Sequence, residues 1–102
     1  MEVSAWKNGR FAPGKPLSLG VSVGRGNAKR FFDKKWAVVL IEFDGTTVPV
    51  KLTSGFWAKC PELRSSAIGD WMKRKGLAPW KTGEPPKMSL VPQDGNRFRL
   101  SV

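Results

Sequence analysis

The apolar segment 36–52, interrupted by one tight turn, constrains the fold of this chain more than any other feature. It reads WAVVLIEF, then Asp44-Gly45, then TTVPVKL. Asp-Gly is a favoured pair for a two-residue hairpin turn, and the flanking β-branched and aromatic residues favour strands. With that turn, Phe43 lies opposite Thr46. The resulting register puts six side chains on one face, which we expect to be the core face: Val39, Ile41, Phe43, Val48, Val50 and Leu52.

The opposite face of the predicted hairpin is also partly apolar. It carries Val38 and Leu40, so we expect another element to cover part of it. Pro49 cannot donate a backbone hydrogen bond, which predicts that its strand is an edge strand or is bulged there.

Three further strands are indicated by patterning. Residues 17–23 alternate between apolar and small polar side chains, which is typical of a half-buried strand. Residues 87–91 and 97–102 surround the turn Asp94-Gly95-Asn96. Residues 28–35 have room for one helical turn.

One good helix is predicted over residues 61–75. Pro61 suits its first turn, and the basic residues near its end suit the negative end of the helix dipole. Gly76 is expected to end the helix. The predicted apolar stripe consists of Leu63, Ala67, Ile68, Trp71 and Met72.

These elements predict a mostly β protein with one helix near 61–75. The sheet is expected to be small, antiparallel and curled, or a pseudobarrel, with about five to seven strands. The chain has 102 residues, which is enough for one domain. Residues 1–16 are basic and rich in turn residues, so we expect an N-terminal arm followed by a single β-rich domain over 17–102.

The charge balance points to an anionic partner. Eighteen Lys and Arg stand against eight Asp and Glu, a net charge of +10. Such an excess attracts polyanions, of which nucleic acid is the commonest. A membrane surface is not expected, because no helix is both strongly basic and richly apolar on its other face. The oligomeric state cannot be read from the sequence.

The single cysteine bears on the cellular compartment of the protein. Cys60 has no partner for an internal disulfide, which fits a reducing compartment, and we expect it to be an inert core residue. No apolar run is long enough to span a bilayer, and the N-terminus lacks a signal-peptide pattern. We therefore expect a cytoplasmic protein, associated with the nucleoid, or a nuclear one in a eukaryote.

Catalysis is not expected. The chain has no His and no Tyr, which removes the commonest general base and every nucleophile paired with His. One Cys without His cannot hold zinc. Glu42 and Asp44 resemble half of a magnesium site, but no third carboxylate falls at suitable spacing. We predict a non-enzyme without metal or cofactor, and a metal-dependent nuclease is the least favoured alternative.

The positive charge is concentrated in the first third of the chain. Residues 7–35 hold eight of the eighteen Lys and Arg against one carboxylate, Asp33. The predicted basic loop over 24–35 is the first choice for the contact surface. Lysines there would contact phosphates, and the arginines, with the outward-facing pair on the last strand, would read bases. The predicted nucleic-acid-binding residues are Arg10, Arg25, Lys29, Arg30, Lys34, Lys35, Arg97 and Arg99.

The five tryptophans divide into two groups. Trp36, Trp57 and Trp71 flank strong apolar segments and are expected in the core. Trp6 and Trp80 lie in predicted loops beside lysines. They either clip these loops onto the domain or stack on unpaired bases.

Residues 36–102 resemble a known family. The hairpin LIEFDGTTVPVKL, the segment TSGFWAKC leading into a helix, and two closing strands are similar in order to B3-type DNA-binding pseudobarrels. Residues 77–86 form a longer, proline-rich insert than that family has. The resemblance implies that DNA is held between two arms, which would be residues 24–30 and 53–59.

We therefore predict a nucleic-acid-binding domain that favours double-stranded DNA. One alternative is an RNA or single-strand binder. Another is a protein-interaction module for an acidic partner, which the partly apolar second face of the hairpin favours.

Overall fold

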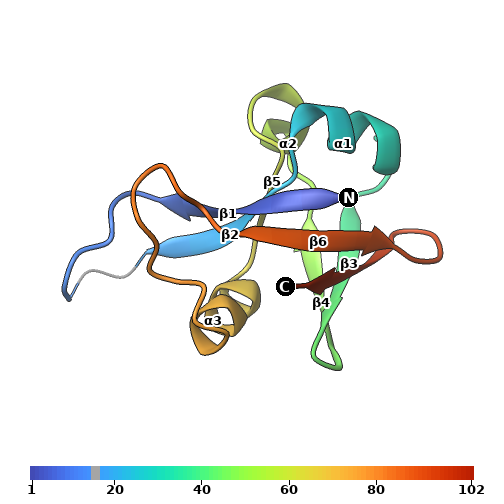
Figure 1. Cartoon of the computed structure of the whole chain (residues 1–102). Helices are drawn as coiled ribbons and strands as arrows, with labels where there is room; N and C mark the ends of the chain where they lie inside the picture. Colours follow the sequence, from blue (N-terminus) through green and yellow to red (C-terminus); the bar gives the residue numbers. More distant parts are fainter. Residues whose placement is uncertain (15–16) are drawn as a thin grey trace.

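The computed structural model describes residues 1–14 and 17–102 and contains one mixed seven-stranded sheet with three helices (Figure 1). The order across the sheet is β4-β3-β7-β6-β1-β2-β5. Neighbouring strands are antiparallel except β3 and β7, which run parallel. The helices are α1 (Arg25–Phe31), α2 (Ser54–Ala58) and α3 (Ser66–Arg74). The strands are β1 (Glu2–Asn8), β2 (Ser18–Ser22), β3 (Val38–Phe43), β4 (Thr46–Lys51), β5 (Glu62–Arg64), β6 (Lys87–Pro92) and β7 (Arg97–Ser101).

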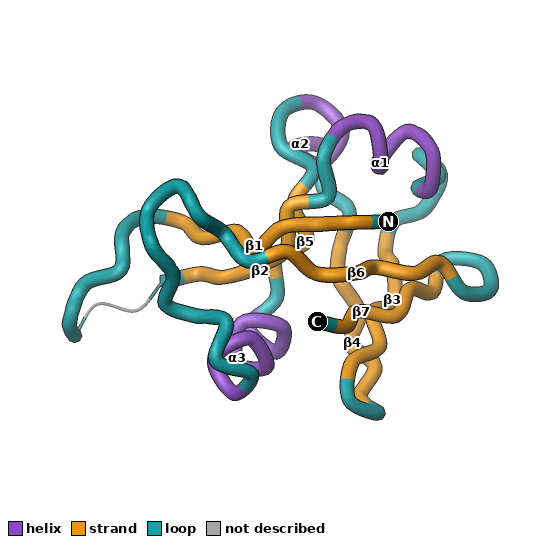
Figure 2. The backbone as a smooth tube through the Cα atoms, in the orientation of Figure 1, coloured by secondary structure: helices purple, strands orange, loops and turns teal. Residues whose placement is uncertain are grey.

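The sheet is curled but not closed. β4 and β5 are its two edges, and no ladder joins them in the described part of the chain. Figure 2 shows α1 and α2 together at one end of the molecule and α3 away from them. The predicted fold class, mostly β with a curled sheet or pseudobarrel, is confirmed, although the parallel β3–β7 pair was not expected.

A single core fills the inside of the curled sheet. Every strand contributes at least one side chain that is 2 % exposed or less. Burial of this apolar surface is the main favourable term in folding. One such residue from each strand, β1 to β7 in turn, is Val3, Val21, Ile41, Val50, Leu63, Leu90 and Phe98.

The predicted hairpin forms β3 and β4 in the expected register. Phe43 pairs with Thr46, and the pairing continues to Val38 opposite Lys51. Asp44 and Gly45 both have positive φ, 48° and 76°, as a tight hairpin turn requires. Pro49 lies on β4, which is an edge strand as predicted. On the second face Val38 and Leu40 are half-buried, so that face is partly covered.

The N-terminal segment differs from its prediction. Residues 1–16 were expected to form an arm, but Glu2–Asn8 form β1, which lies between β6 and β2 in the sheet. Val3 and Ala5 are buried and alternate with less buried residues, a short period-two pattern that the nearby turn residues obscured. Lys15 and Pro16 lie outside the described residues.

The predicted helix over 61–75 begins later than expected. Glu62–Arg64 form the edge strand β5, whose middle residue Leu63 is buried, and α3 starts at Ser66. Ser65 provides the N-cap, because its Oγ accepts a hydrogen bond from the Ile68 amide at 3.4 Å. Gly76 ends the helical segment with φ 72°, as predicted.

The hairpin turn is tied to α3 through Asp44. Its Oδ2 accepts hydrogen bonds from Trp71 Nε1 and Lys75 Nζ, both at 3.1 Å. The hydrogen bond from Lys75 is the main reason why the pKa of Asp44 lies below its ordinary value of 3.8. The charged carboxylate thus joins two elements that are distant in sequence.

Acid should release this link. Because the pKa of Asp44 is lower in the folded than in the unfolded protein, its charge stabilises the fold fully above about pH 4. That stabilisation is lost as the pH falls through the folded-state pKa. Asp44→Asn tolerates the positive φ but cannot carry the charge. At pH 7 we expect the urea unfolding midpoint of this variant to lie below that of the unaltered protein, and we expect the difference to shrink at pH 3. An equal difference at both pH values would contradict the link.

Gly20 allows β5 to approach β2 closely. It pairs with Arg64, and a Cβ at this position would lie 2.4 Å from the Leu63 carbonyl oxygen. Only a residue without a side chain fits there.

We predict opposite effects for two alanine substitutions. Gly20→Ala should lower the free energy of unfolding by about 2–3 kcal/mol, since the sheet edge must shift. Gly26→Ala should raise it by about 0.5–1 kcal/mol, because its Cβ meets nothing within 4 Å and it lies in a helix. Chemical denaturation measures both, and equal midpoints for the two variants would refute the close approach.

Candidate nucleic-acid interface

The predicted basic loop over 24–35 is largely a helix. α1 begins at Arg25, earlier than the helical turn expected over 28–35, and Gly24 precedes it with φ 87°. The Ala28 amide bonds to the Gly24 carbonyl at 3.0 Å. Asn27 ties the helix to its surroundings, because its Nδ2 donates to the carbonyls of Val23 and Glu2, both at 3.0 Å. Residues 25–31 are therefore a helix rather than the expected loop.

An aromatic cluster seats α1 and α2 on the end of the sheet. The Phe32 ring, just after α1, stacks on Phe98 of β7 with 4.6 Å between centroids. It also lies 5.2 Å from Phe56 of α2. Phe32, Phe56 and Phe98 are all buried, so α1 and α2 share one apolar base.

Direct contacts also join α1 to α2. Arg25 Nη2 donates to the Lys59 carbonyl at 3.4 Å. Lys34 Nζ lies 6.0 Å from the centre of the Trp57 ring. Between the helices is a groove of about 350 Å³ lined by Arg25, Lys29, Lys34 and Trp57 among others. Segments 24–30 and 53–59, which the B3 resemblance assigns to the two arms, are thus neighbours here.

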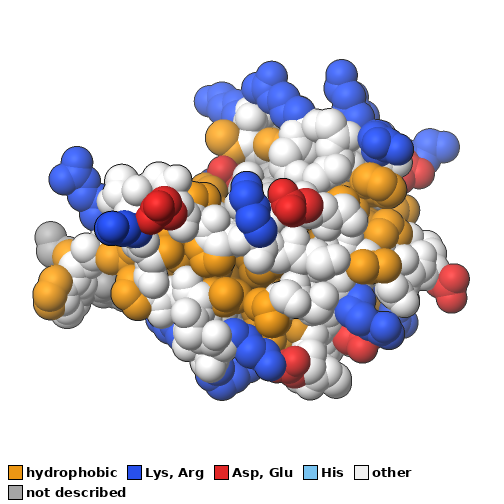
Figure 3. Space-filling view, in the orientation of Figure 1, with side chains coloured by type: hydrophobic (Ala, Val, Ile, Leu, Met, Phe, Trp, Pro, Cys, Tyr) orange, Lys and Arg blue, Asp and Glu red, His pale blue; other side chains and the backbone are white. Residues whose placement is uncertain are grey.

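Exposed cations gather at this end. Figure 3 shows Lys and Arg side chains projecting over α1 and α2, while others lie near α3 and elsewhere. The ion pairs in the described residues lie outside this end of the molecule. Asp33 is engaged locally, since its Oδ1 accepts the Lys35 amide at 2.8 Å. We define the α1–α2 surface as the exposed basic residues Arg25, Lys29, Arg30, Lys34, Lys35 and Lys59.

Three other predicted contacts lie outside the α1–α2 surface. Arg97 and Arg99 are exposed on β7, on the opposite face from Phe98. Arg99 Nε lies 3.6 Å from a carboxylate oxygen of Glu42. Arg10 follows the far end of β1, about 20 Å of strand away from the Glu2 carbonyl that α1 contacts.

Most tryptophans pack within the molecule. Trp71 is buried, and Trp36 and Trp57 are half-buried against the core. Trp80 packs edge-on against Phe11 at 4.8 Å, and the Arg64 guanidinium lies 4.5 Å from the Trp6 ring centre. Trp6 lies in β1 rather than in the expected loop, and both candidates for base stacking are already in contact with other side chains.

Cys60 is exposed, so the expectation of a core cysteine was wrong. It follows Lys59 at the end of the α2 segment, where the chain turns into β5. Lys51, Lys59 and Arg64 were not among the predicted contact residues, because isolated cations in strands and turns give no local signal. Lys59 does lie within the second arm, 53–59, that the B3 resemblance implies.

The carboxylates considered for a metal site have other partners. Glu42 faces Arg99, and Asp44 binds Trp71 and Lys75. Over residues 1–14 and 17–102, no cluster of three or more His, Cys, Asp or Glu is placed to hold a metal ion. Among the same residues, no helix is both long and apolar enough to cross a bilayer.

The chain matches no known protein family, no curated protein and no solved structure. The resemblance to B3-type domains therefore stays a prediction.

Proposed function

We propose that this protein binds nucleic acid, with double-stranded DNA favoured, through the α1–α2 surface. The observation that carries the proposal is the convergence of six exposed cations from two segments that are separate in sequence. Their segments pack on a buried aromatic base, and the six cations have no ion-pair partner among the described residues.

The arrangement suits phosphate contacts. Cations with free donor groups neutralise phosphates and release counterions, which gives salt-dependent affinity. Arg25 and Lys29 are four residues apart and lie on one face of α1, and Gly26 next to them leaves the helix backbone accessible. A helix fits the major groove of B-DNA, which is about 12 Å wide. Arg25 and Arg30 are the α1 residues suited to bidentate contacts with guanine.

The aromatic residues favour a duplex over a single strand. Binding of unpaired bases usually depends on aromatic rings open for stacking. Trp6 is in contact with Arg64, and Trp80 is in contact with Phe11. Trp57 packs edge-on against Phe56 at 4.9 Å and has Lys34 over its ring.

The salt dependence of affinity tests the proposal. For a fluorescent B-DNA duplex of about 16 base pairs, six phosphate contacts predict a log–log slope of about −5 between 50 and 200 mM NaCl. Replacing Arg25, Lys29 and Lys34 with Gln should reduce this slope by about 3 and weaken binding at 0.1 M salt by roughly 100-fold or more. Fluorescence anisotropy measures both quantities.

A charge-matched control separates local contacts from net charge. Replacing Lys73, Arg74 and Lys81 with Gln removes the same number and types of charge from elsewhere on the surface. This control should keep most of the affinity and slope. Equal losses in both triple variants, or no binding by the unaltered protein, would overturn the proposal. Stronger competition by single strands than by duplex would overturn the preference for duplex DNA.

A further inference from the structure

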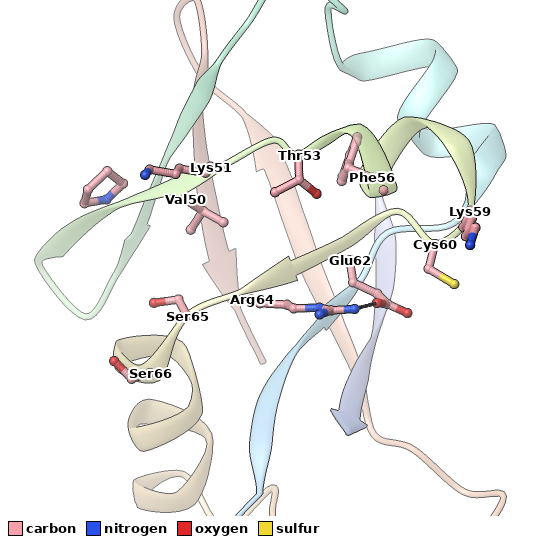
Figure 4. A pocket seen from close by; sticks show the side chains of 12 residues that line it. Val50, Lys51, Thr53, Phe56, Lys59, Cys60, Glu62, Arg64, Ser65 and Ser66 are labelled. Atoms are coloured by element: carbon pink, nitrogen blue, oxygen red, sulfur yellow. Dashed lines mark hydrogen bonds and ion pairs between the residues drawn. The ribbon is translucent and has the colours of Figure 1, made fainter. Parts of the chain in front are cut away.

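The open seam of the sheet forms a groove beside the α1–α2 surface. Its volume is about 580 Å³, and it lies between the two edge strands β4 and β5. Figure 4 shows the β4–α2 segment along one side and β5, leading to Ser65 and Ser66, along the other. Phe56 and α2 separate this seam groove from the groove between α1 and α2, and Phe56 lines both. The two concavities are therefore adjacent.

The seam groove is basic. Lys51, Lys59 and Arg64 line it with one carboxylate, Glu62, and with the side chains of Thr53, Ser65 and Ser66. Glu62 is already engaged, since Arg64 Nη2 lies 3.0 Å from its Oε1. An anion entering the groove would meet cations and hydroxyl groups.

Arg64 is held in place but remains accessible. Its guanidinium lies 4.5 Å from the Trp6 ring centre on one side and bonds to Glu62 on the other. Trp6, Gly20 and Arg64 occupy one row across β1, β2 and β5, and Gly20 has no side chain to separate the other two. The Arg64 side chain is still 63 % exposed, whereas that of Glu62 is 10 % exposed. A fixed, exposed guanidinium with spare donors suits a phosphate oxygen pair.

The two edges are poorly suited to an added peptide strand. Pro49 removes a backbone donor from β4, and Lys51 places a charge at the same edge. β5 has only three residues. Strand addition depends on a run of free main-chain donors and acceptors, which these edges do not offer. Charge complementarity instead favours a phosphodiester chain.

We propose that the seam groove binds the phosphate backbone of one nucleic-acid strand that continues from the α1–α2 surface. Lys51 and Arg64 are its contacts beyond α2, and Lys59 lies where the two surfaces meet. Trp6 and Glu62 act as positioning residues that hold Arg64. This inference rests on the proposed function and extends its contact surface.

Charge removal tests the seam separately from α1. With the same duplex, two seam contacts in addition to the six of the α1–α2 surface would bring the log–log salt slope of the unaltered protein to about −7, and replacing Lys51 and Arg64 with Gln should return it to about −5. A slope of about 0.9 per contact means that each contact strengthens binding roughly eightfold when the salt concentration falls from 1 M to 0.1 M. The matched control replaces Arg74 and Lys81 with Gln. Arg64→Lys keeps the charge but loses the planar fork, so it should keep the slope and weaken binding by about threefold or more.

A second measurement places the ligand directly. The indole N–H resonances of Trp6 and Trp57 are assigned by Trp→Phe substitution, and duplex DNA is then titrated into the unaltered protein. We expect both resonances to shift over the same concentration range. A shift of Trp57 alone, together with an unchanged slope in the Lys51 and Arg64 variant, would overturn the seam inference and leave the proposed function standing.

A different result is expected if the proposed function itself is wrong. In that case the unaltered protein would not bind duplex DNA and neither indole resonance would shift. Displacement of bound DNA by polyglutamate at an equal concentration of charged groups would show a preference for acidic polypeptide, and would also overturn the seam inference.

Discussion

The packing of Phe32 between Phe98 and Phe56 is the interaction on which the candidate site depends. Phe98 belongs to the sheet, Phe56 to α2, and Phe32 to the segment that leaves α1. One buried ring thus fixes two short helices that have little intrinsic stability of their own. Without this base, the cations of the α1–α2 surface would lose their common orientation. Because the base is apolar and buried, it holds the charged surface without neutralising any of its charge.

Much of the fold could be predicted because its signals are local. The Asp44-Gly45 turn set the β3–β4 register, and alternation identified β2 and β7. The parallel pairing of β3 with β7 could not be predicted, since partners that are distant in sequence leave no local pattern. β5 was missed because Glu62-Leu63-Arg64 is short and continues into a helical stripe. β1 was missed because turn residues follow it closely.

Part of the candidate site could be predicted from the sequence. The cations Arg25, Lys29, Arg30, Lys34 and Lys35 fall within one short segment, 25–35, and the structure places this segment at one end of the molecule (Figure 3). Lys59 joins them only through tertiary packing, and Arg64 gains its position from Trp6 on β1 and from Glu62 on its own strand. The chain segment around Arg25 was expected to be a loop. It is a helix instead, held by the hydrogen bonds of Asn27 and the burial of Ala28. Composition does not reveal either of these contacts.

The central claim is that nucleic acid covers the end of the molecule formed by α1 and α2. Lysine reactivity toward a small acylating reagent, mapped by mass spectrometry with and without duplex DNA, tests it most directly. The account predicts that Lys29, Lys34 and Lys59 are protected while Lys75 and Lys81 react as before. Uniform protection of all five lysines, or protection of Lys75 and Lys81 alone, would contradict it.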